Sequence, residues 1–372
     1  MHYKNVYSKK HVPVADGSIM LAKYAHDDIV IVMKVFLGMS GGVDSAVSAY
    51  LLRERGYEVV GVYMKNWSKN LPGMKCPWAE DLADAKRTAV KLGLDFRVFD
   101  FEMEYKQKVV DYMLTEYQKG NTPNPDIMCN QEIKFKLFAE TAFGQGAEMI
   151  ATGHYARTDG SALLKAVDEN KDQTYFLYRI TEDVISKTIF PVGGMKKPEV
   201  KALAEKIGLS VAHKAESMGV CFVGEANMKD FLAEFVETKP GKIIEIETGK
   251  ELGVHDGAIF YTLGQRHGLN IKIGLPYYVV KKDMEQNIIY VSQNLNSLKL
   301  WTREVKLKEV ILRHGDDGRH IQARIRHRAP LVDADYVDGK LTFAEEQKSL
   351  TPGQSIVFYR GDICLGGGII EA

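Results

Sequence analysis

The stretch Gly38-Met39-Ser40-Gly41-Gly42-Val43-Asp44-Ser45 constrains the fold of this chain more than any other feature. A run rich in Val and Ile, from Ile29 to Leu37, precedes it and is typical of a buried strand. The apolar residues that follow recur with the spacing of one helix face as far as Gly56. The sequence therefore predicts a strand that turns through glycines directly into a helix. Backbone N–H groups in such a turn point at a bound anion, which the helix N-terminus also favours.

This loop has the composition of a nucleotide phosphate site. Gly41 and Gly42 let an anion approach the main chain, and Ser40 and Ser45 add hydroxyl donors. Asp44 is a carboxylate beside phosphates, which indicates a bound magnesium ion. No Gly-Lys-Ser/Thr follows, so the stretch is not a Walker loop. It resembles the Ser-Gly-Gly-x-Asp-Ser loop of the ATP pyrophosphatases (PP-loop superfamily), which release pyrophosphate from ATP and leave AMP on a substrate. A glycine-rich turn without a ligand is the alternative.

Composition excludes several classes of protein. At 372 residues the chain is long enough for two or three domains. No apolar segment reaches the roughly 18 residues that a membrane span needs, so we expect no membrane partner. The 49 basic and 49 acidic residues balance, and any nucleic-acid contact must therefore come from a local patch. Four cysteines are too few for a disulfide scaffold, which favours a reducing, cytoplasmic setting.

Strands and helices alternate between residues 33 and 225, which predicts an α/β domain built on a doubly wound parallel sheet. Ligands of such sheets bind at the carboxyl ends of the strands. That rule gathers the 38–45 loop, Met64, the 121–129 segment and Gly153 at one edge.

The rest of the chain has a different pattern. Short strands broken by glycine predict a small mixed central domain over 226–298, and the loss of helical periodicity predicts a C-terminal β-barrel over 299–372. Residues 1–32 are treated as an N-terminal extension of doubtful status, because Met33 would make a natural start. An extra edge strand is the competing interpretation.

Two cysteines lie beside turns and are candidate nucleophiles. Cys129 follows Asn124-Pro125-Asp126 at the expected start of a helix near Asn130, and a helix N-terminus lowers the pKa of a thiol. Asp126 could act as an acid or base, but its charge would oppose ionisation of the thiol. Cys221 lies beside the glycine turn at Gly219. From the residues alone, each thiol is equally well explained as a small buried apolar side chain.

A series of short segments, taken in order, resembles the bacterial tRNA-specific 2-thiouridylases from residue 33 to the end of the chain. The segments are Gly38–Ser45, Met64–Trp67, Ala79–Ala85, Thr122–Asn130, Ile133–Lys136, Ala151–Tyr155, Lys171–Leu177, Gly219–Phe222, Thr262–Arg266, Thr351–Gln354 and Cys364–Gly368. The resemblance implies ATP-dependent 2-thiolation of the wobble uridine (position 34) of tRNA. ATP, with Mg²⁺, would adenylate the uridine O2, and a persulfide would then deliver sulfur to C2 as AMP leaves. The implied partners are tRNA and a persulfide donor, either a cysteine desulfurase or a sulfur-relay protein.

Carried over position by position, the resemblance also implies residue roles. It makes Cys129 the nucleophile and Cys221 the carrier of the persulfide. It implies ATP binding by Gly38, Met39, Ser40, Gly41, Gly42, Val43, Asp44, Ser45, Met64 and Gly153. It implies contact with the target base by Asn124, Pro125 and Asp126, and with tRNA by His154, Lys171, Asp172, Gln173, Arg326, His327 and Gln354. His327 stands where the family usually has tyrosine, which should weaken stacking on a base.

The stretch from Trp301 to Arg328 supplies the expected basic patch, with a solvated barrel surface as the alternative. Its basic residues are Arg303, Lys306, Lys308, Arg313, Arg319, Arg324, Arg326 and Arg328. We therefore expect the barrel to contribute tRNA affinity rather than chemistry. Two other functions remain open at this point. One is another tRNA-adenylating enzyme, such as a lysidine-forming ligase, or a nucleotide amidotransferase, neither of which needs paired thiols. The other is an ATP-responsive RNA-binding protein without turnover.

Overall fold

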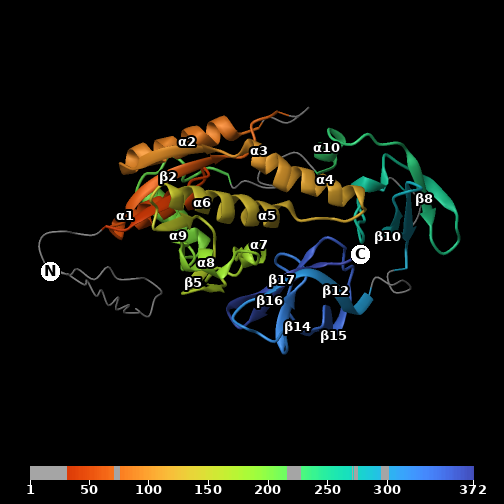
Figure 1. Cartoon of the computed structure of the whole chain (residues 1–372). Helices are drawn as coiled ribbons and strands as arrows, with labels where there is room; N and C mark the ends of the chain where they lie inside the picture. Colours follow the sequence, from red (N-terminus) through yellow and green to blue (C-terminus); the bar gives the residue numbers. More distant parts are fainter. Residues whose placement is uncertain (1–31, 71–75, 216–227, 270, 272–274, 295–300) are drawn as a thin grey trace, which may run out of the picture.

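The computed structural model describes residues 32–70, 76–215, 228–269, 271, 275–294 and 301–372. Figure 1 shows a parallel-sheet region (red to green), a small sheet (teal) and a barrel (blue) in chain order. Within these described ranges, no helix is long and apolar enough to cross a membrane. The predicted N-terminal extension lies, apart from Val32, outside the described residues.

A five-stranded parallel sheet organises the first region. Its order is β3-β2-β1-β4-β7, so the chain starts in the middle and winds outward in both directions, which confirms the predicted doubly wound sheet. The strands are β1 (Lys34–Gly38), β2 (Glu58–Lys65), β3 (Asp95–Asp100), β4 (Met149–Thr152) and β7 (Thr188–Ile189). The winding direction reverses between β1 and β4, which is where open α/β sheets bind their ligands.

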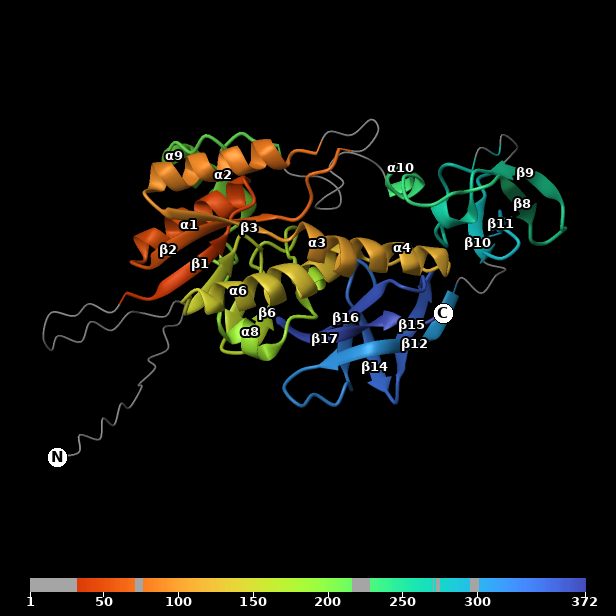
Figure 2. The same cartoon turned by 45° about the horizontal axis from the view of Figure 1, so that its top comes forward.

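Helices cover both faces of this sheet (Figure 2). Successive residues of a strand point to opposite faces, so Val35 and Leu37 pack with α1 and α2 while Phe36 packs under the opposite helices. One face carries α1 (Val43–Glu54), α2 (Trp78–Leu92) and α9 (Lys197–Lys206). The other carries two long helices, one made of α3 (Glu102–Tyr105), η1 (Lys106–Val110) and α4 (Asp111–Gln118), the other of α5 (Pro125–Met128), η2 (Cys129–Leu137) and α6 (Phe138–Gly144).

Two predicted element boundaries are wrong. The first strand spans Lys34–Gly38, so Val32 and Met33 of the predicted run precede it, and residues 29–31 of that run lie outside the described residues. The helix that carries Cys129 begins at Pro125 rather than near Asn130. Asn124 caps it, because its Oδ1 accepts hydrogen bonds from the backbone N–H groups of Asp126 (3.1 Å) and Ile127 (3.3 Å). Proline suits the first helical position, where its missing N–H costs nothing. Cys129 therefore lies inside a helix, at the start of its π-helical segment η2.

The last two regions have the predicted architectures. The central sheet, with order β10-β11-β8-β9, is mixed, because β8 and β11 run parallel and the other pairs antiparallel. Its strands are β8 (Gly241–Glu245), β9 (Glu251–His255), β10 (Tyr278–Asp283) and β11 (Ile288–Ser292), with α10 (Met228–Ala233) before them and η3 (Ala258–Phe260) between β9 and β10. The barrel closes where β12 pairs with β17. Its strands are β12 (Trp301–Leu312), β13 (Ile321–Arg324), β14 (Val332–Val337), β15 (Lys340–Lys348), β16 (Ser355–Arg360) and β17 (Ile363–Ile370).

The barrel is joined to the parallel-sheet region in a way that the sequence pattern did not indicate. The hairpin of β5 (Arg157–Asp159) and β6 (Ala162–Leu164) adds to barrel strand β17. Beside it lie the short helices α7 (Thr174–Leu177) and α8 (Glu182–Ser186). Arg313 is 3% exposed, and its guanidinium donates to the carbonyl oxygens of Tyr178, Ile180 (2.6 Å) and Cys364 (3.2 Å). This buried arginine fastens the barrel to the segment after α7.

Candidate active site

The predicted nucleotide loop lies between β1 and α1, at the carboxyl edge of the sheet. A Cβ added at Gly38 would lie 2.9 Å from Met64 Cε, so the end of β2 meets the start of the loop. A Cβ added at Gly153 would lie 2.7 Å from the backbone nitrogen of Ser45, so the segment after β4 packs on the first turn of α1. The structure thus brings together all the residues predicted to bind ATP, and their binding of ATP stays a prediction.

Bonds within the loop hold its shape. Ser45 Oγ donates to the Gly42 carbonyl (3.0 Å) and accepts the Ser40 N–H (3.2 Å). Gly41 has φ +76°, and a Cβ there would lie 2.3 Å from the carbonyl oxygen of Asp81 on α2. Only glycine fits both that backbone conformation and that close approach. The loop is therefore fixed by its own serines and by the first turn of α2.

Asp44 is held by two side chains that sequence reasoning missed. Lys197 Nζ lies 2.6 and 2.8 Å from its two carboxylate oxygens, and the Tyr155 hydroxyl donates to Oδ1 at 2.8 Å. The Lys197 side chain is 9% exposed and that of Asp44 31% exposed. A cation that binds Asp44 must therefore share the carboxylate with Lys197 or displace it. A lysine at the start of a helix is common in surface helices, so the sequence offered no specific signal for this pair.

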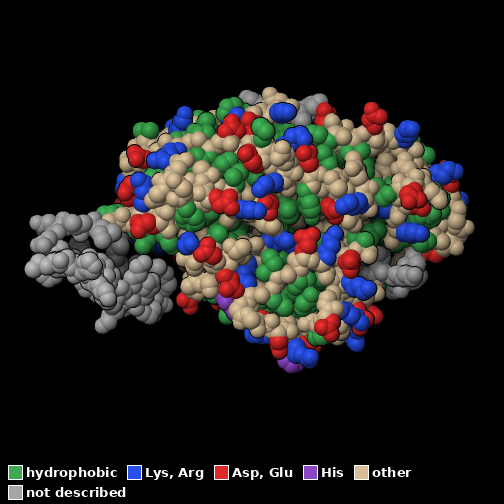
Figure 3. All heavy atoms as spheres, viewed as in Figure 1, with side chains coloured by type: hydrophobic (Ala, Val, Ile, Leu, Met, Phe, Trp, Pro, Cys, Tyr) green, Lys and Arg blue, Asp and Glu red, His purple; other side chains and the backbone are tan. Residues whose placement is uncertain are grey.

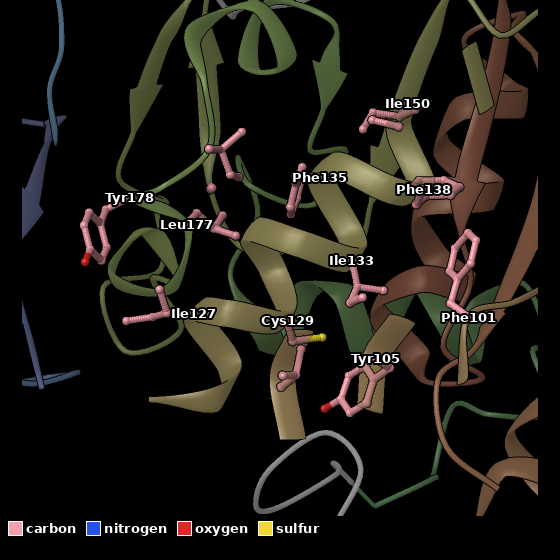
Figure 4. Close-up of a cluster of buried hydrophobic side chains, with 14 of the residues drawn as sticks. Phe101, Tyr105, Ile127, Cys129, Ile133, Phe135, Phe138, Ile150, Leu177 and Tyr178 are labelled. Carbon is pink, nitrogen blue, oxygen red and sulfur yellow. The ribbon is translucent and has the colours of Figure 1, made fainter. Parts of the chain in front are cut away.

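The segment predicted to contact the target base leads into the helix that holds Cys129. Pro123, Pro125 and Cys129 are buried, and Asn124 and Asp126 are half-buried. Cys129 is 0% exposed and belongs to an apolar cluster with Tyr105 and Ile133, as Figure 4 shows. A thiol in this position needs a movement of the protein before it can reach a substrate. Cys221, the predicted persulfide carrier, lies outside the described residues.

The predicted tRNA contacts at 171–173 point mainly into the protein. Asp172 is 2% exposed, accepts the Thr174 hydroxyl proton at 2.9 Å and pairs with Arg324 at 3.0 Å. Gln173 Oε1 accepts the Tyr155 N–H at 2.8 Å. Asp172 thus connects the segment to the barrel, and Gln173 connects it to Tyr155, whose hydroxyl bonds Asp44. Lys171 is half-buried, and the assignment of all three residues to tRNA stays a prediction.

His154 lies next to Gly153 and is half-buried. Its Nδ1 is 2.8 Å from the Thr152 hydroxyl, and its ring packs against Phe135 and Phe190. Burial, with a smaller contribution from the charge of Lys134, holds the pKa of His154 well below its ordinary value. His154 is therefore a neutral imidazole, able to form hydrogen bonds but not to neutralise a phosphate.

The barrel residues predicted to contact tRNA divide into exposed and inward-facing side chains. Arg326 is exposed, with Nη2 donating to the Ser349 carbonyl at 2.9 Å. His327 packs on Phe176, with ring centroids 4.5 Å apart. Burial lowers the pKa of His327 to about 4, so it too is neutral near pH 7. Gln354 Nε2 donates to the Thr122 carbonyl at 2.6 Å, a contact within the protein.

The predicted basic patch is smaller than the sequence indicated. Arg313 is buried at the junction with α7, and Arg324 pairs with the buried Asp172. These two residues are not part of a solvent-facing patch, because each serves to join the barrel to the parallel-sheet region. On the face shown in Figure 3, basic and acidic side chains are interspersed.

Comparisons with known proteins cover nearly the whole described chain. Family models described as tRNA methyl transferase HUP domain, tRNA methyl transferase PRC-barrel domain and aminomethyltransferase beta-barrel domain match residues 33–225, 229–293 and 304–370. The tRNA-specific 2-thiouridylase MnmA of Listeria monocytogenes serotype 4b is 44% identical over 352 residues, covering 91% of this chain and 95% of that protein. MnmA of Bacillus licheniformis is 43% identical over 355 residues, with 91% and 95% coverage.

A solved structure of a 4-thiouridine synthetase–RNA complex with bound ATP is also similar in part. It is 20% identical, with a TM-score of 0.36 over 54% of this chain and 50% of that chain. A likeness of this size carries no argument about function.

Proposed function

This chain belongs to the family of tRNA-specific 2-thiouridylases, and from that membership we propose that it catalyses ATP-dependent 2-thiolation of the wobble uridine in tRNA. The observation that carries the proposal is the meeting of the 38–45 loop, Met64 and Gly153 at the carboxyl edge of the parallel sheet. Two of the matching family descriptions name methyl transfer. A loop suited to nucleotide phosphates, and the roles that the resemblance to the thiouridylases implies for Cys129 and Cys221, favour sulfur transfer.

The reaction begins with activation of the base. The uridine O2 attacks the α-phosphate of ATP, pyrophosphate leaves, and the base carries AMP as a good leaving group. Backbone N–H groups of the loop, with Ser40 and Ser45, are suited to hold the phosphates. Asn124 and Asp126 would meet the extruded base, since an anticodon-loop base unstacks at a lower cost than a base in a duplex.

Magnesium fits the site only as a companion of ATP. In the described ranges no group of three or more His, Cys, Asp or Glu could hold a metal ion. Mg²⁺ commonly binds through one or two carboxylates together with substrate phosphates. Asp44 would supply the carboxylate, and Lys197, which now pairs with it, would then turn its charge toward the phosphates. The ion would neutralise charge that develops on the phosphate oxygens.

Sulfur transfer would use two thiols. Cys221 accepts the terminal sulfur from a persulfide donor, either a cysteine desulfurase or a relay protein, and that sulfur replaces O2 at C2 as AMP departs. By either of two routes, Cys129 attacks Sγ of Cys221 and forms a disulfide with it. It does so before transfer, expelling hydrosulfide that then displaces AMP at C2, or after the terminal sulfur has bonded to C2 and AMP has left, expelling the 2-thiolated base. An external dithiol would then reduce that disulfide, as expected in the cytoplasm. Because Cys129 is buried, the helix that carries it must open or shift when tRNA binds.

We also propose a division of the chain by task. Residues 33–225 would bind ATP and carry out thiolation, and 299–372 would bind tRNA. Residues 226–298 would connect the two, and 1–32 would be dispensable. His154, Lys171, Gln173, Arg326, His327 and Gln354 remain the proposed tRNA contacts. Asp172 would act through its buried ion pair with Arg324 rather than by touching RNA.

Serine substitutions of the two thiols test the proposal. Cys129→Ser and Cys221→Ser should each abolish thiolation while pyrophosphate release continues, and only Cys129→Ser should still load a persulfide on Cys221. Cys364→Ser is the matched control, because Cys364 is also 0% exposed and burial raises its pKa to about 11. Normal thiolation in either test variant, or a persulfide trapped on Cys364, would contradict the roles proposed for Cys129 and Cys221. Full activity without the thiols would instead favour a lysidine-forming type of ligase, which the relatives do not support.

A further inference from the structure

A loop of the barrel binds the main chain just before the predicted base-contacting segment. The N–H of Thr122 donates to the carbonyl of Pro352 at 2.8 Å, and Gln354 Nε2 donates to the carbonyl of Thr122 at 2.6 Å. Both backbone polar groups of Thr122 are thus satisfied by residues more than 200 positions later in the chain. Thr122 is 9% exposed, so these bonds are shielded from water.

Each side of this contact is itself fixed. Gly353 N–H donates to the carbonyl of Ile370 at 3.0 Å, and Ile370 N–H donates to the carbonyl of Gln354 at 2.8 Å, which ties the loop to the end of β17. On the other side, Asn121 Nδ2 donates to the buried carboxylate of Glu116 at 2.8 Å. The contact therefore joins two anchored segments and is not a meeting of two loose loops.

The position of Thr122 is passed on to the residues that follow. The rings of Pro123 and Pro125 fix two of the φ angles between Thr122 and the first turn of α5, which shortens the freely rotating part of this connection. Asn124 caps that turn, and Cys129 lies one turn further along the same helix. A shift of Thr122 would accordingly move the predicted base contacts and the predicted nucleophile together.

We propose that the barrel loop Thr351–Gln354 is a positioning element for thiolation, which sets the register of the Asn124–Cys129 segment against the activated base. Gln354 is then a positioning residue that acts through Thr122, in addition to any contact it makes with tRNA. This inference rests on the proposed function for its kinetic test. It assigns to the barrel a part in the chemistry, where the sequence predicted tRNA affinity alone.

Two glycines of the barrel provide a matched test. Gly353 has φ +89°, and a Cβ there would lie 2.9 Å from the backbone nitrogen of Thr122. Gly339 has φ +82°, and a Cβ added there would meet no atom within 4 Å. Gly353→Ala and Gly339→Ala therefore impose the same backbone penalty, and only the first pushes on Thr122. Gly353→Ala should lower kcat for thiolation about tenfold to a hundredfold, because small displacements of reacting groups cost that much. Its Kd for tRNA should stay within about twofold of the Gly339→Ala value, since no phosphate contact is lost.

A second variant covers the case in which Gly353→Ala does not fold. Gln354→Glu keeps the size of the side chain but replaces the donor to the Thr122 carbonyl with a carboxylate. It should lower kcat, measured at saturating tRNA, in the same way, while its Kd for tRNA should rise because Gln354 is also a proposed tRNA contact. A higher Kd for tRNA with kcat unchanged would overturn the inference, since the loop would then be only a binding surface. So would equal kcat values for Gly353→Ala and Gly339→Ala.

A readout that does not depend on catalysis separates this inference from the proposed function. The rate at which iodoacetamide alkylates Cys129, measured by mass spectrometry on the intact chain without tRNA, reports how tightly the segment is held. Gly353→Ala should raise that rate about threefold or more over Gly339→Ala, because local opening exposes the thiol. Equal rates would overturn the positioning role. If Cys129 is alkylated faster in Gly353→Ala than in Gly339→Ala but the wild-type chain does not thiolate tRNA, the proposed function is wrong. The conclusion that the barrel loop positions the Asn124–Cys129 segment would still hold.

Discussion

The nucleotide loop and the segment that leads to Cys129 are held in different ways. The loop is held mainly by contacts near in sequence, namely the bonds among Ser40, Gly42 and Ser45 and its place between β1 and α1, with Asp81 of α2 packed against Gly41. The segment before Cys129 depends on Pro352 and Gln354, which belong to the barrel. The first arrangement is completed within the parallel-sheet region, whereas the second requires the barrel to fold as well.

This difference separates two kinds of requirement. Holding the phosphates of ATP needs backbone N–H groups and a helix start, which one strand–turn–helix unit supplies. Placing a base against a sulfur carrier requires two long segments to meet in a set register, so contacts distant in sequence must fix it. Substitutions in the loop should thus affect activation of the base, and substitutions at the barrel junction should affect transfer or stability.

The largest of these effects is expected in the loop itself. Asp44→Asn should lower pyrophosphate release about 10²–10³-fold, because it removes one electrostatic stabiliser of the phosphates and their metal ion. Asp81→Asn on α2 is the control, since Asp81 also bonds a lysine, Lys214, at 2.7 Å. Pyrophosphate release, measured at saturating magnesium with ATP and tRNA, should fall for the first variant and stay near the wild-type rate for the second. Equal losses would mean that ion-pair stability, and not phosphate chemistry, explains the effect.

The junction should respond in stability rather than in ATP binding. Arg313→Met leaves the buried carbonyls of Tyr178, Ile180 and Cys364 without their donor, which should cost about 3–5 kcal/mol of unfolding free energy. The exposed Arg319 provides a control, and Arg319→Met should change the unfolding free energy by less than about 0.5 kcal/mol. Urea denaturation measures both. A loss below about 1 kcal/mol for Arg313→Met would contradict the buried anchoring role.

The order of elements and the nucleotide loop could be predicted from the sequence, because both depend on local signals. The buried strand before Gly38, the helix face after it and the glycine-broken strands of the barrel each occupy a continuous stretch. The start of α5 was misjudged because the cap, Asn124, lies inside a Pro-rich run that also reads as a loop. That error placed Cys129 at a helix end, where its thiol would be activated, instead of in the apolar cluster.

Pairings between distant segments could not be predicted. Nothing in the residues near Lys197 indicates that it meets Asp44, 153 positions away. In the same way, Arg313 and Arg324 have the composition of a basic patch and differ from exposed arginines only in the carbonyls and the carboxylate that the fold brings to them. The sequence shows how many basic residues a strand carries, but only the fold shows which of them are exposed and able to contact a polyanionic partner.

The smallest effect expected here concerns Arg326, one of the exposed arginines of the barrel. Arg326→Ala should lower the slope of log Kd against log salt for tRNA by about 0.7–0.9, the contribution of one phosphate contact. Arg55, an exposed arginine at the end of α1 and outside the basic patch, provides the control, and Arg55→Ala should leave the slope unchanged. Binding titrations between about 50 and 200 mM salt give both slopes. Unchanged slopes for both variants would remove Arg326 from the set of tRNA contacts. The barrel would then contribute chiefly through its two hydrogen bonds to Thr122. The nucleotide loop, held within the parallel-sheet region, and the segment before Cys129, held by the barrel, would then differ still more clearly.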